Sequence, residues 1–119
     1  MQREQFQCPI EVVVDVVGGK WKLPILYQLF QGTKRYGELK RLVPEATERM
    51  LTLQLRELEH AGIVQRTVYP EVPPKVEYSL TELGLSLEPV LLTMLDWSEK
   101  YLRLQEERLR NANSTLSAV

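Results

Sequence analysis

The sequence has 119 residues, of which 44% are hydrophobic and 26% charged, so it supports one compact domain with one core rather than two. The net charge of −1 argues against a polyanionic partner until its distribution is considered, because residues 18–69 carry nine Lys/Arg and five Glu. A single cysteine excludes an internal disulfide bond, and without an apolar run of about 18 residues or a signal-type N-terminus we expect a soluble cytoplasmic protein with no membrane partner.

The first predicted helix covers residues 9–17. Proline is favoured at the first position of a helix, so Pro9 places Cys8 at the N-cap. An apolar stripe follows at helical spacing: Ile10, Val13, Val14 and Val17. Gly18 and Gly19 then end the helix.

A second helix is predicted over residues 20–30. It tolerates Pro24 because the first turn of a helix has no intrahelical N–H bonds to lose. A third helix over residues 36–43 buries Leu39 and Leu42 and ends where a proline follows at position 44.

Thr47 is a good N-cap for a fourth helix over residues 48–60. Three leucines at helical spacing, Leu51, Leu55 and Leu58, form its inner face. Glu48 in the first turn complements the positive end of the helix dipole. The third and fourth helices, with a short turn between them, predict a helix-turn-helix.

Two strands are predicted over residues 63–69 and 75–80, which are rich in Val, Thr and Tyr and alternate in polarity. The segment between them, residues 70–74, contains three prolines and cannot continue a hydrogen-bonded ladder. The strands therefore form a hairpin, or wing. The predicted fold is mainly α with a small β-wing, a winged helix-turn-helix.

Thr81 caps a last helical region that reaches about Asn111, with leucines mostly at i+4 spacing and with Pro89 kinking or splitting it. Such a long helix has more apolar surface than one small domain covers, which indicates a partner subunit. We therefore expect a domain over residues 1–110 that forms a homodimer through its N- and C-terminal helices. Residues 111–119 are expected to be a disordered tail.

The outward face of the fourth helix carries the side-chain types that read the major groove of DNA. It comprises Thr47, Glu48, Arg49, Thr52, Leu53 and Arg56. Arg49 can bond to guanine with two hydrogen bonds, and Thr52 can contact a base edge or a thymine methyl group. Arg56 lies farther along the helix, where it meets a phosphate.

Two further basic clusters lie on elements that dock in winged domains. Four residues, Thr33, Lys34, Arg35 and Tyr36, are expected in a loop that binds phosphate before the third helix. Arg66 and Lys75 project from the wing toward the flanking backbone or minor groove. Isolated charges are ordinary solvated side chains, but three clusters on these elements predict double-stranded DNA as the partner.

Several consecutive motifs resemble those of HxlR-type transcriptional regulators. They are Cys8-Pro9-Ile10-Glu11, Gly18-Gly19-Lys20-Trp21, Gly32-Thr33-Lys34-Arg35-Tyr36-Gly37-Glu38-Leu39, Leu55-Arg56-Glu57-Leu58-Glu59 and Tyr78-Ser79-Leu80-Thr81-Glu82-Leu83-Gly84. The resemblance implies a cytoplasmic, nucleoid-associated bacterial regulator, related to the MarR-like group, that binds pseudo-palindromic operators as a homodimer. The family pattern usually has a polar residue, often Gln, where this chain has Leu53, so Leu53 either contacts a thymine methyl group or is buried.

Cys8 has two interpretations. At the start of a helix, the dipole and the free N–H groups favour a reactive thiolate. Some HxlR-type proteins have an N-terminal Cys before Pro that senses oxidants or electrophiles, and the resemblance implies that Cys8 pairs with Cys8 of the other subunit or with a small thiol. The alternative is a small buried hydrophobic residue.

The sequence also offers alternatives to DNA binding. An aromatic set, Trp21, Tyr27, Trp97 and Tyr101, could bind a small aromatic effector at the dimer interface or could simply pack. A winged domain can also serve as a protein-interaction module without DNA. His60 lacks a second metal ligand at suitable spacing, and no phosphate loop or catalytic set occurs, so we expect no cofactor, no metal and no enzymatic activity.

Overall fold

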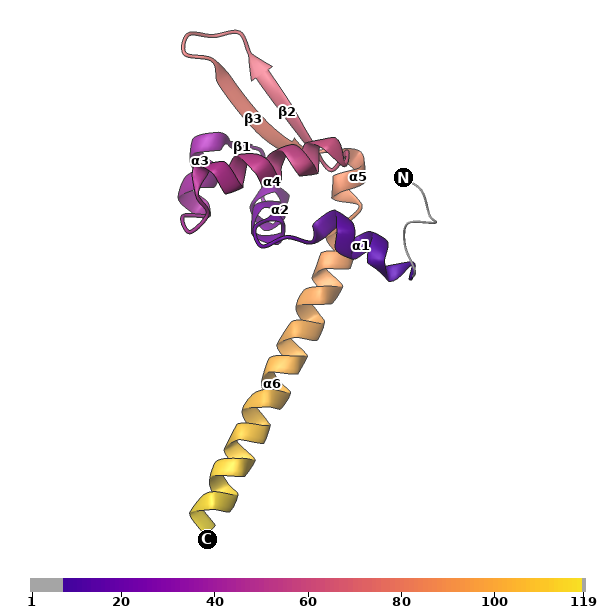
Figure 1. Cartoon of the computed structure of the whole chain (residues 1–119), viewed down its shortest axis with the longest axis vertical. Helices are drawn as coiled ribbons and strands as arrows, with labels where there is room; N and C mark the ends of the chain where they lie inside the picture. The colour runs from indigo at the N-terminus through magenta and orange to yellow at the C-terminus, as the bar shows by residue number, and fades with distance from the viewer. Residues whose placement is uncertain (1–7, 119) are drawn as a thin grey trace. The chain divides into compact units, whose positions relative to one another are not determined.

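The structure is a computed structural model that describes residues 8–118, and it describes the side chains of residues 8–114. The described chain divides into two compact units, one ending at Leu85 and one beginning at Ser86. Figure 1 shows the order of the elements along the chain. The first unit contains four helices, a small sheet and a short fifth helix, and the second is a single long helix.

The first unit is built on four helices: α1 (Ile10–Val17), α2 (Lys22–Phe30), α3 (Tyr36–Leu42) and α4 (Glu48–His60). Their apolar faces form the core with the start of β2. The largest fully buried side chains are Ile25, Leu26, Leu39, Leu51, Leu55, Leu58 and Val64. The leucine face predicted for the fourth helix is thereby confirmed. Leu42, expected in the core, is 45% exposed because it is the last residue of α3.

The helix starts are set by local signals, with small shifts from the sequence prediction. Thr47 Oγ1 accepts a hydrogen bond from Met50 N at 3.1 Å and so caps α4 as predicted. The N-cap of α1 is Pro9 rather than Cys8, whose carbonyl oxygen accepts a bond from the backbone N of Glu11 at 2.9 Å. Cys8 therefore lies just outside the helix, one position earlier than predicted.

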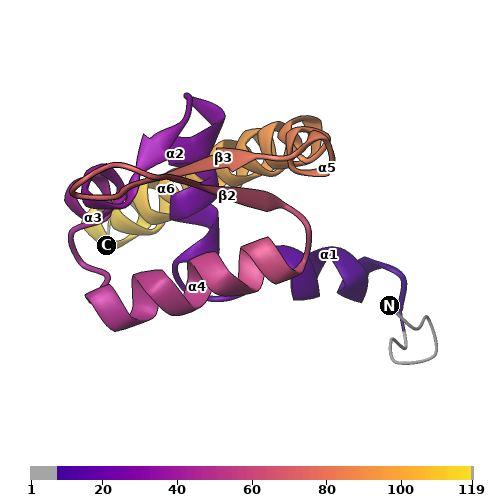
Figure 2. The same ribbon diagram turned by 90° about the horizontal axis from the view of Figure 1, so that it is seen from above.

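The sheet has three antiparallel strands in the order β1-β3-β2, where β1 is Lys34–Arg35, β2 is Val64–Tyr69 and β3 is Lys75–Leu80. The predicted hairpin is present, and in both views it turns back from the C-terminal end of α4 toward α3 (Figures 1 and 2). The prediction that Lys34 and Arg35 lie in a loop is wrong. They pair with Tyr78 and Glu77 of β3, on the edge of β3 that β2 leaves free. No local sequence pattern predicts this pairing.

A close contact joins the end of the wing to the short helix α5 (Glu82–Leu85). The hydroxyl of Thr81 accepts a hydrogen bond from Gly84 N at 3.0 Å, and the backbone N of Thr81 donates to the carbonyl of Ile63 at 3.0 Å. A Cβ at position 84 would overlap this Ile63 carbonyl oxygen, so the close approach requires glycine.

The second unit is the helix α6, which spans Glu88–Ala118. The predicted final helical region is thus split between α5 and α6, and Pro89 lies in the first turn of α6, where it costs no intrahelical bond. The helix continues past Asn111, where it was expected to end. Asn and Ser are weak helix formers, but without Gly or Pro nothing in residues 111–118 interrupts the backbone hydrogen bonds.

Candidate nucleic-acid interface

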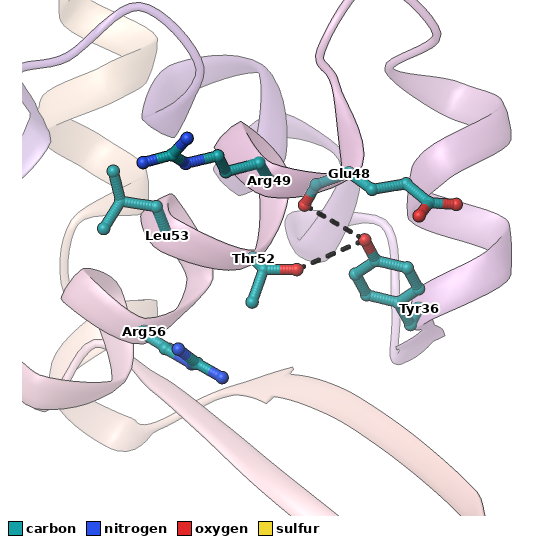
Figure 3. A pocket seen from close by; sticks show the side chains of 6 residues that line it. All are labelled: Tyr36, Glu48, Arg49, Thr52, Leu53 and Arg56. Atoms are coloured by element: carbon teal, nitrogen blue, oxygen red, sulfur yellow. Dashed lines mark hydrogen bonds between the residues drawn. The ribbon is translucent and has the colours of Figure 1, made fainter.

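The outward face of α4 is open to solvent over its first three turns. Arg49, Leu53 and Arg56 are exposed, and Thr52 between them is half-buried. Together with Tyr36 and Glu48 they line a shallow depression of about 410 Å³, shown in Figure 3. Leu53 is 46% exposed, which decides between its two interpretations in favour of a surface residue. The polar and apolar groups of the predicted reading face therefore lie together.

Tyr36, the first residue of α3, ties the two helices of the helix-turn-helix together. Its hydroxyl donates to the backbone carbonyl of Glu48 at 3.2 Å and lies 3.2 Å from Thr52 Oγ1 (Figure 3). These bonds connect residues far apart in sequence. Tyr36, predicted to bind phosphate, thus also holds the start of α4 through its hydroxyl.

The turn between α3 and α4 is fixed by another side chain. Lys40 Nζ donates to the carbonyl oxygen of Ala46 at 2.7 Å and to that of Pro44 at 3.3 Å. At the other end of α3, Glu38 Oε1 accepts a bond from the backbone N of Arg35 at 3.1 Å. Lys40 therefore satisfies turn carbonyls, and its charge contributes to the fold of the motif.

A buried polar contact fixes the inner side of α4 against α2. Lys22 Nζ lies 2.8 Å from Glu57 Oε2, and the Lys22 side chain is only 10% exposed. Gln54 Nε2 donates to the same carboxylate at 3.4 Å. Gly19, with φ +116°, lies so close that a Cβ there would be 2.7 Å from Gln54 Oε1. Lys22, one of the nine Lys/Arg residues in residues 18–69, is thus buried.

The two cations of the wing lie on opposite faces of the hairpin. Arg66 pairs across the ladder with Tyr78, and Lys75 pairs with Tyr69. Because side chains alternate between the two faces along a strand, these two pairs lie on opposite faces. Arg66 is exposed and lines a second pocket of about 320 Å³ with Tyr36, Thr52, Arg56, Glu59 and Tyr78. The structure therefore brings Arg66 next to the outward face of α4.

Lys75 is held by its own hairpin. Its ammonium lies 3.0 Å from Glu77 Oε1 and 4.9 Å from the centre of the Tyr69 ring. The Tyr69 hydroxyl also donates to Glu77 Oε2 at 3.4 Å. By contrast, Arg49, Arg56 and Arg66 form no ion pair with the residues that the structure describes. The free positive charge at the candidate interface is therefore arginine rather than Lys75.

The remaining predicted residues take the following positions. Thr33 and Arg35 are exposed, and Lys34 is half-buried in β1. Lys34 and Arg66 both pair with Tyr78 of the central strand, from opposite sides of it. Thr47 and Glu48 are exposed at the start of α4. Two residues of the segment predicted to bind phosphate, Lys34 and Arg35, thus form an edge strand of the sheet, in which Lys34 lies across Tyr78 from Arg66.

Cys8 is exposed, so its interpretation as a small buried residue is wrong. It precedes α1, in which the apolar residues Ile10 (71%) and Val14 (60%) are also exposed. Trp97 and Tyr101 stack on each other within α6, with ring centres 5.3 Å apart.

The described residues contain neither a candidate membrane-spanning helix nor a candidate metal site. Across residues 8–118, no helix combines the length and apolar character needed to cross a lipid bilayer. The described part of the chain also holds no group of three or more His, Cys, Asp or Glu side chains arranged to bind a metal ion.

The order of elements and the outward face of α4 define the class of protein. Two helices joined by a fixed turn precede a β-hairpin, and the second helix presents arginines and small side chains to solvent. This is a winged helix-turn-helix, the architecture of MarR-type transcriptional regulators.

Sequence and structure comparisons identify the family. The HxlR-like helix-turn-helix family matches residues 16–106. The uncharacterized HTH-type transcriptional regulator YdeP of Bacillus subtilis (strain 168) is 61% identical over 94 residues, which cover 79% of this chain and 73% of YdeP. The chain therefore belongs to the HxlR-like family and is a transcriptional regulator rather than an enzyme.

Two solved structures of one redox regulator, HypR, are similar to this chain. The oxidized form is 58% identical, covers 78% of this chain and 96% of its own, and has a TM-score of 0.73. The reduced form is 54% identical, covers 84% of this chain and 99% of its own, and has a TM-score of 0.79. Both support the winged-helix assignment.

Proposed function

We propose that this protein regulates transcription by binding a pseudo-palindromic operator as a homodimer, with its DNA affinity controlled through the thiol of Cys8. The observation that carries the DNA-binding part is the outward face of α4, where Arg49 and Arg56 are exposed and unpaired with the described residues. A regulator of this kind acts where the chromosome lies, so we place it in the cytoplasm.

The side chains of the interface divide into two roles. Arg49, in the first turn of α4, is placed to bond to guanine in the major groove. Arg56 and Arg66 line one pocket between α4 and the wing, where both can contact the phosphate backbone. Thr33, Lys34 and Arg35 extend this basic surface along the edge of the sheet.

Dimerisation is supported by apolar surface on the two terminal helices. Ile10 and Val14 of α1 are exposed although they lie at helical spacing on one face. In α6, Leu95, Leu102 and Leu109 recur every seven residues and are between 49% and 65% exposed. Such seams are typical of helices that pair with a second copy, and a two-fold axis would set the two copies of α4 about 34 Å apart.

The test of DNA binding is to select operator sequences with the full-length protein and to measure affinity by fluorescence anisotropy. We expect an inverted repeat and an affinity at least about 10³-fold above that for unrelated DNA. The affinity should fall steeply with salt, because bound arginines release counterions. Equal weak binding to every duplex, or a module that binds only protein, would contradict the proposal.

Cys8 is proposed as the switch because it is exposed and directly precedes α1, whose residues Ile10 and Val14 are exposed as well. Two Cys8 thiols, one from each subunit, would lose two protons and two electrons to an oxidant such as diamide and form an intersubunit disulfide. The similar HypR structures, solved in oxidized and reduced forms, belong to a redox regulator.

We expect diamide to change the operator affinity of the wild type by at least about tenfold, reversibly with dithiothreitol, because allosteric couplings are commonly of this size. Cys8→Ser should keep the affinity of the reduced wild type and should not respond to diamide. Non-reducing electrophoresis distinguishes a disulfide-linked dimer from a mixed disulfide with a small thiol. An identical diamide response in Cys8→Ser would remove Cys8 from the switch.

A further inference from the structure

We propose that Tyr36 orients Thr52 so that α4 presents a methyl group to the 5-methyl group of thymine in each operator half-site. This inference rests on the proposed DNA binding of α4. Tyr36 would be a positioning residue, because it acts through Thr52, and Thr52 with Leu53 would read the base.

The hydrogen bonds of Tyr36 fix which atom donates. A tyrosine hydroxyl has one hydrogen, and only that hydrogen can serve the backbone carbonyl of Glu48, 3.2 Å away. The contact between Tyr36 Oη and Thr52 Oγ1, also 3.2 Å, must then use the hydrogen of Thr52. The Thr52 hydroxyl is therefore already used as a donor.

These bonds also replace the usual partner of a helical threonine. Thr hydroxyls inside helices commonly bond to the carbonyl four residues earlier, which for Thr52 is that of Glu48. Here the Tyr36 hydroxyl donates to this carbonyl, and the Thr52 hydroxyl donates to the Tyr36 hydroxyl instead. Because Thr is β-branched and stiff at χ1, fixing Oγ1 also fixes the methyl group, which points away from the Tyr36 hydroxyl (Figure 3).

Leu53 adds a second apolar group to the same surface. It is 46% exposed, and it lines the depression together with Thr52 and the two arginines Arg49 and Arg56. Residues three and four apart share a helix face, so Arg49 lies beside both Thr52 and Leu53. An apolar pair next to an arginine matches a thymine that neighbours a guanine, because thymine is the base that carries a methyl group in the major groove.

The experiment replaces thymine by deoxyuridine, which lacks the 5-methyl group, one position at a time in both half-sites of the selected operator. Affinity for the full-length, reduced protein is measured by anisotropy. At one or two thymines per half-site, we expect the wild type to bind the deoxyuridine operator about fourfold more weakly per half-site, the effect of removing one buried methyl group.

Three variants separate reading from positioning. Thr52→Ser keeps the hydroxyl and removes the methyl group, so it should discriminate between the two operators less than the wild type, with only the contribution of Leu53 left. Tyr36→Phe releases the Thr52 hydroxyl and should weaken binding while bringing the thymine-to-deoxyuridine ratio close to one. Thr52→Val keeps a methyl group in a stiff β-branched side chain and should retain the discrimination.

Tyr27→Phe is the matched control, because Tyr27 is 62% exposed on α2 and does not line the depression. Thermal unfolding confirms that each variant is folded before binding is measured. A wild type that ignores deoxyuridine at every thymine would overturn the inference, as would full discrimination in Tyr36→Phe. Both results require specific operator binding, so they differ from a failure of the proposed function, in which no operator is selected.

Discussion

At the scale of single residues, the structure separates cations that are exposed from cations that hold the fold. Lys22 and Lys40 are two of the nine cations in residues 18–69. Lys22 is buried against Glu57, and Lys40 donates to carbonyl oxygens of the turn between α3 and α4. Charge counted along a sequence therefore overstates the charge available to a phosphate. The exposed arginines Arg49, Arg56 and Arg66 are the better measure of it.

Two helical glycines should respond to alanine in opposite ways. Gly84→Ala should destabilise the protein by about 2 kcal/mol or more, because the new Cβ would overlap the carbonyl oxygen of Ile63. Gly37→Ala in α3 should stabilise it by about 0.5–1 kcal/mol, since nothing lies within 4 Å of the added Cβ and alanine is the better helix former. Urea unfolding measures both. Equal effects of the two substitutions would show that the contact between α5 and the sheet is looser than described.

At the scale of elements, one of the two wing cations lies on the same surface as α4 and the other does not. Arg66 shares a pocket with Arg56 of α4, whereas Lys75 lies on the other face of the hairpin and is paired with Glu77. The position of the wing was therefore predicted correctly, but its two cations differ in their contacts.

The salt dependence of operator binding should reveal this inequality. Between about 50 and 200 mM salt, Arg66→Ala should reduce the slope of log affinity against log salt by about one unit, as expected for a lost phosphate contact. Lys75→Ala should change the slope by less than about half as much, because Glu77 and Tyr69 already hold its ammonium. The assignment of roles in the wing is wrong if Lys75→Ala has the larger effect.

At the scale of the whole molecule, the proposed function involves a second copy of the chain. An inverted-repeat operator matches a two-fold dimer, and the apolar seam of α6 offers the surface for it.

The seam can be tested by placing a charge in it. Leu102→Glu should weaken self-association by at least about a hundredfold, because two leucines per dimer each lose about 1.5–3 kcal/mol of burial. It should weaken operator binding as well. Sedimentation equilibrium measures the mass, and Arg103→Glu, an exposed neighbour on the same helix, is the control. A wild type that remains a monomer while binding the full inverted repeat would contradict the dimer.

Local signals in the sequence were enough to predict helices α1 to α4, the hairpin and the class of protein. Pro9, Thr47 and the glycines end or begin helices through the backbone of their nearest neighbours, and the leucine spacing of α4 defines its buried face. The outward positions of α4 followed from the same periodicity.

Which side chains meet across the chain depends instead on how the elements pack in the folded protein. The strand β1, the pairing of Lys22 with Glu57 and the hydrogen bonds of Tyr36 to α4 all join segments at least 12 residues apart. Local propensity carries no information about such partners, since each forms only when the core brings two elements together. The orientation of Thr52, on which the proposed reading of thymine depends, belongs to this second group.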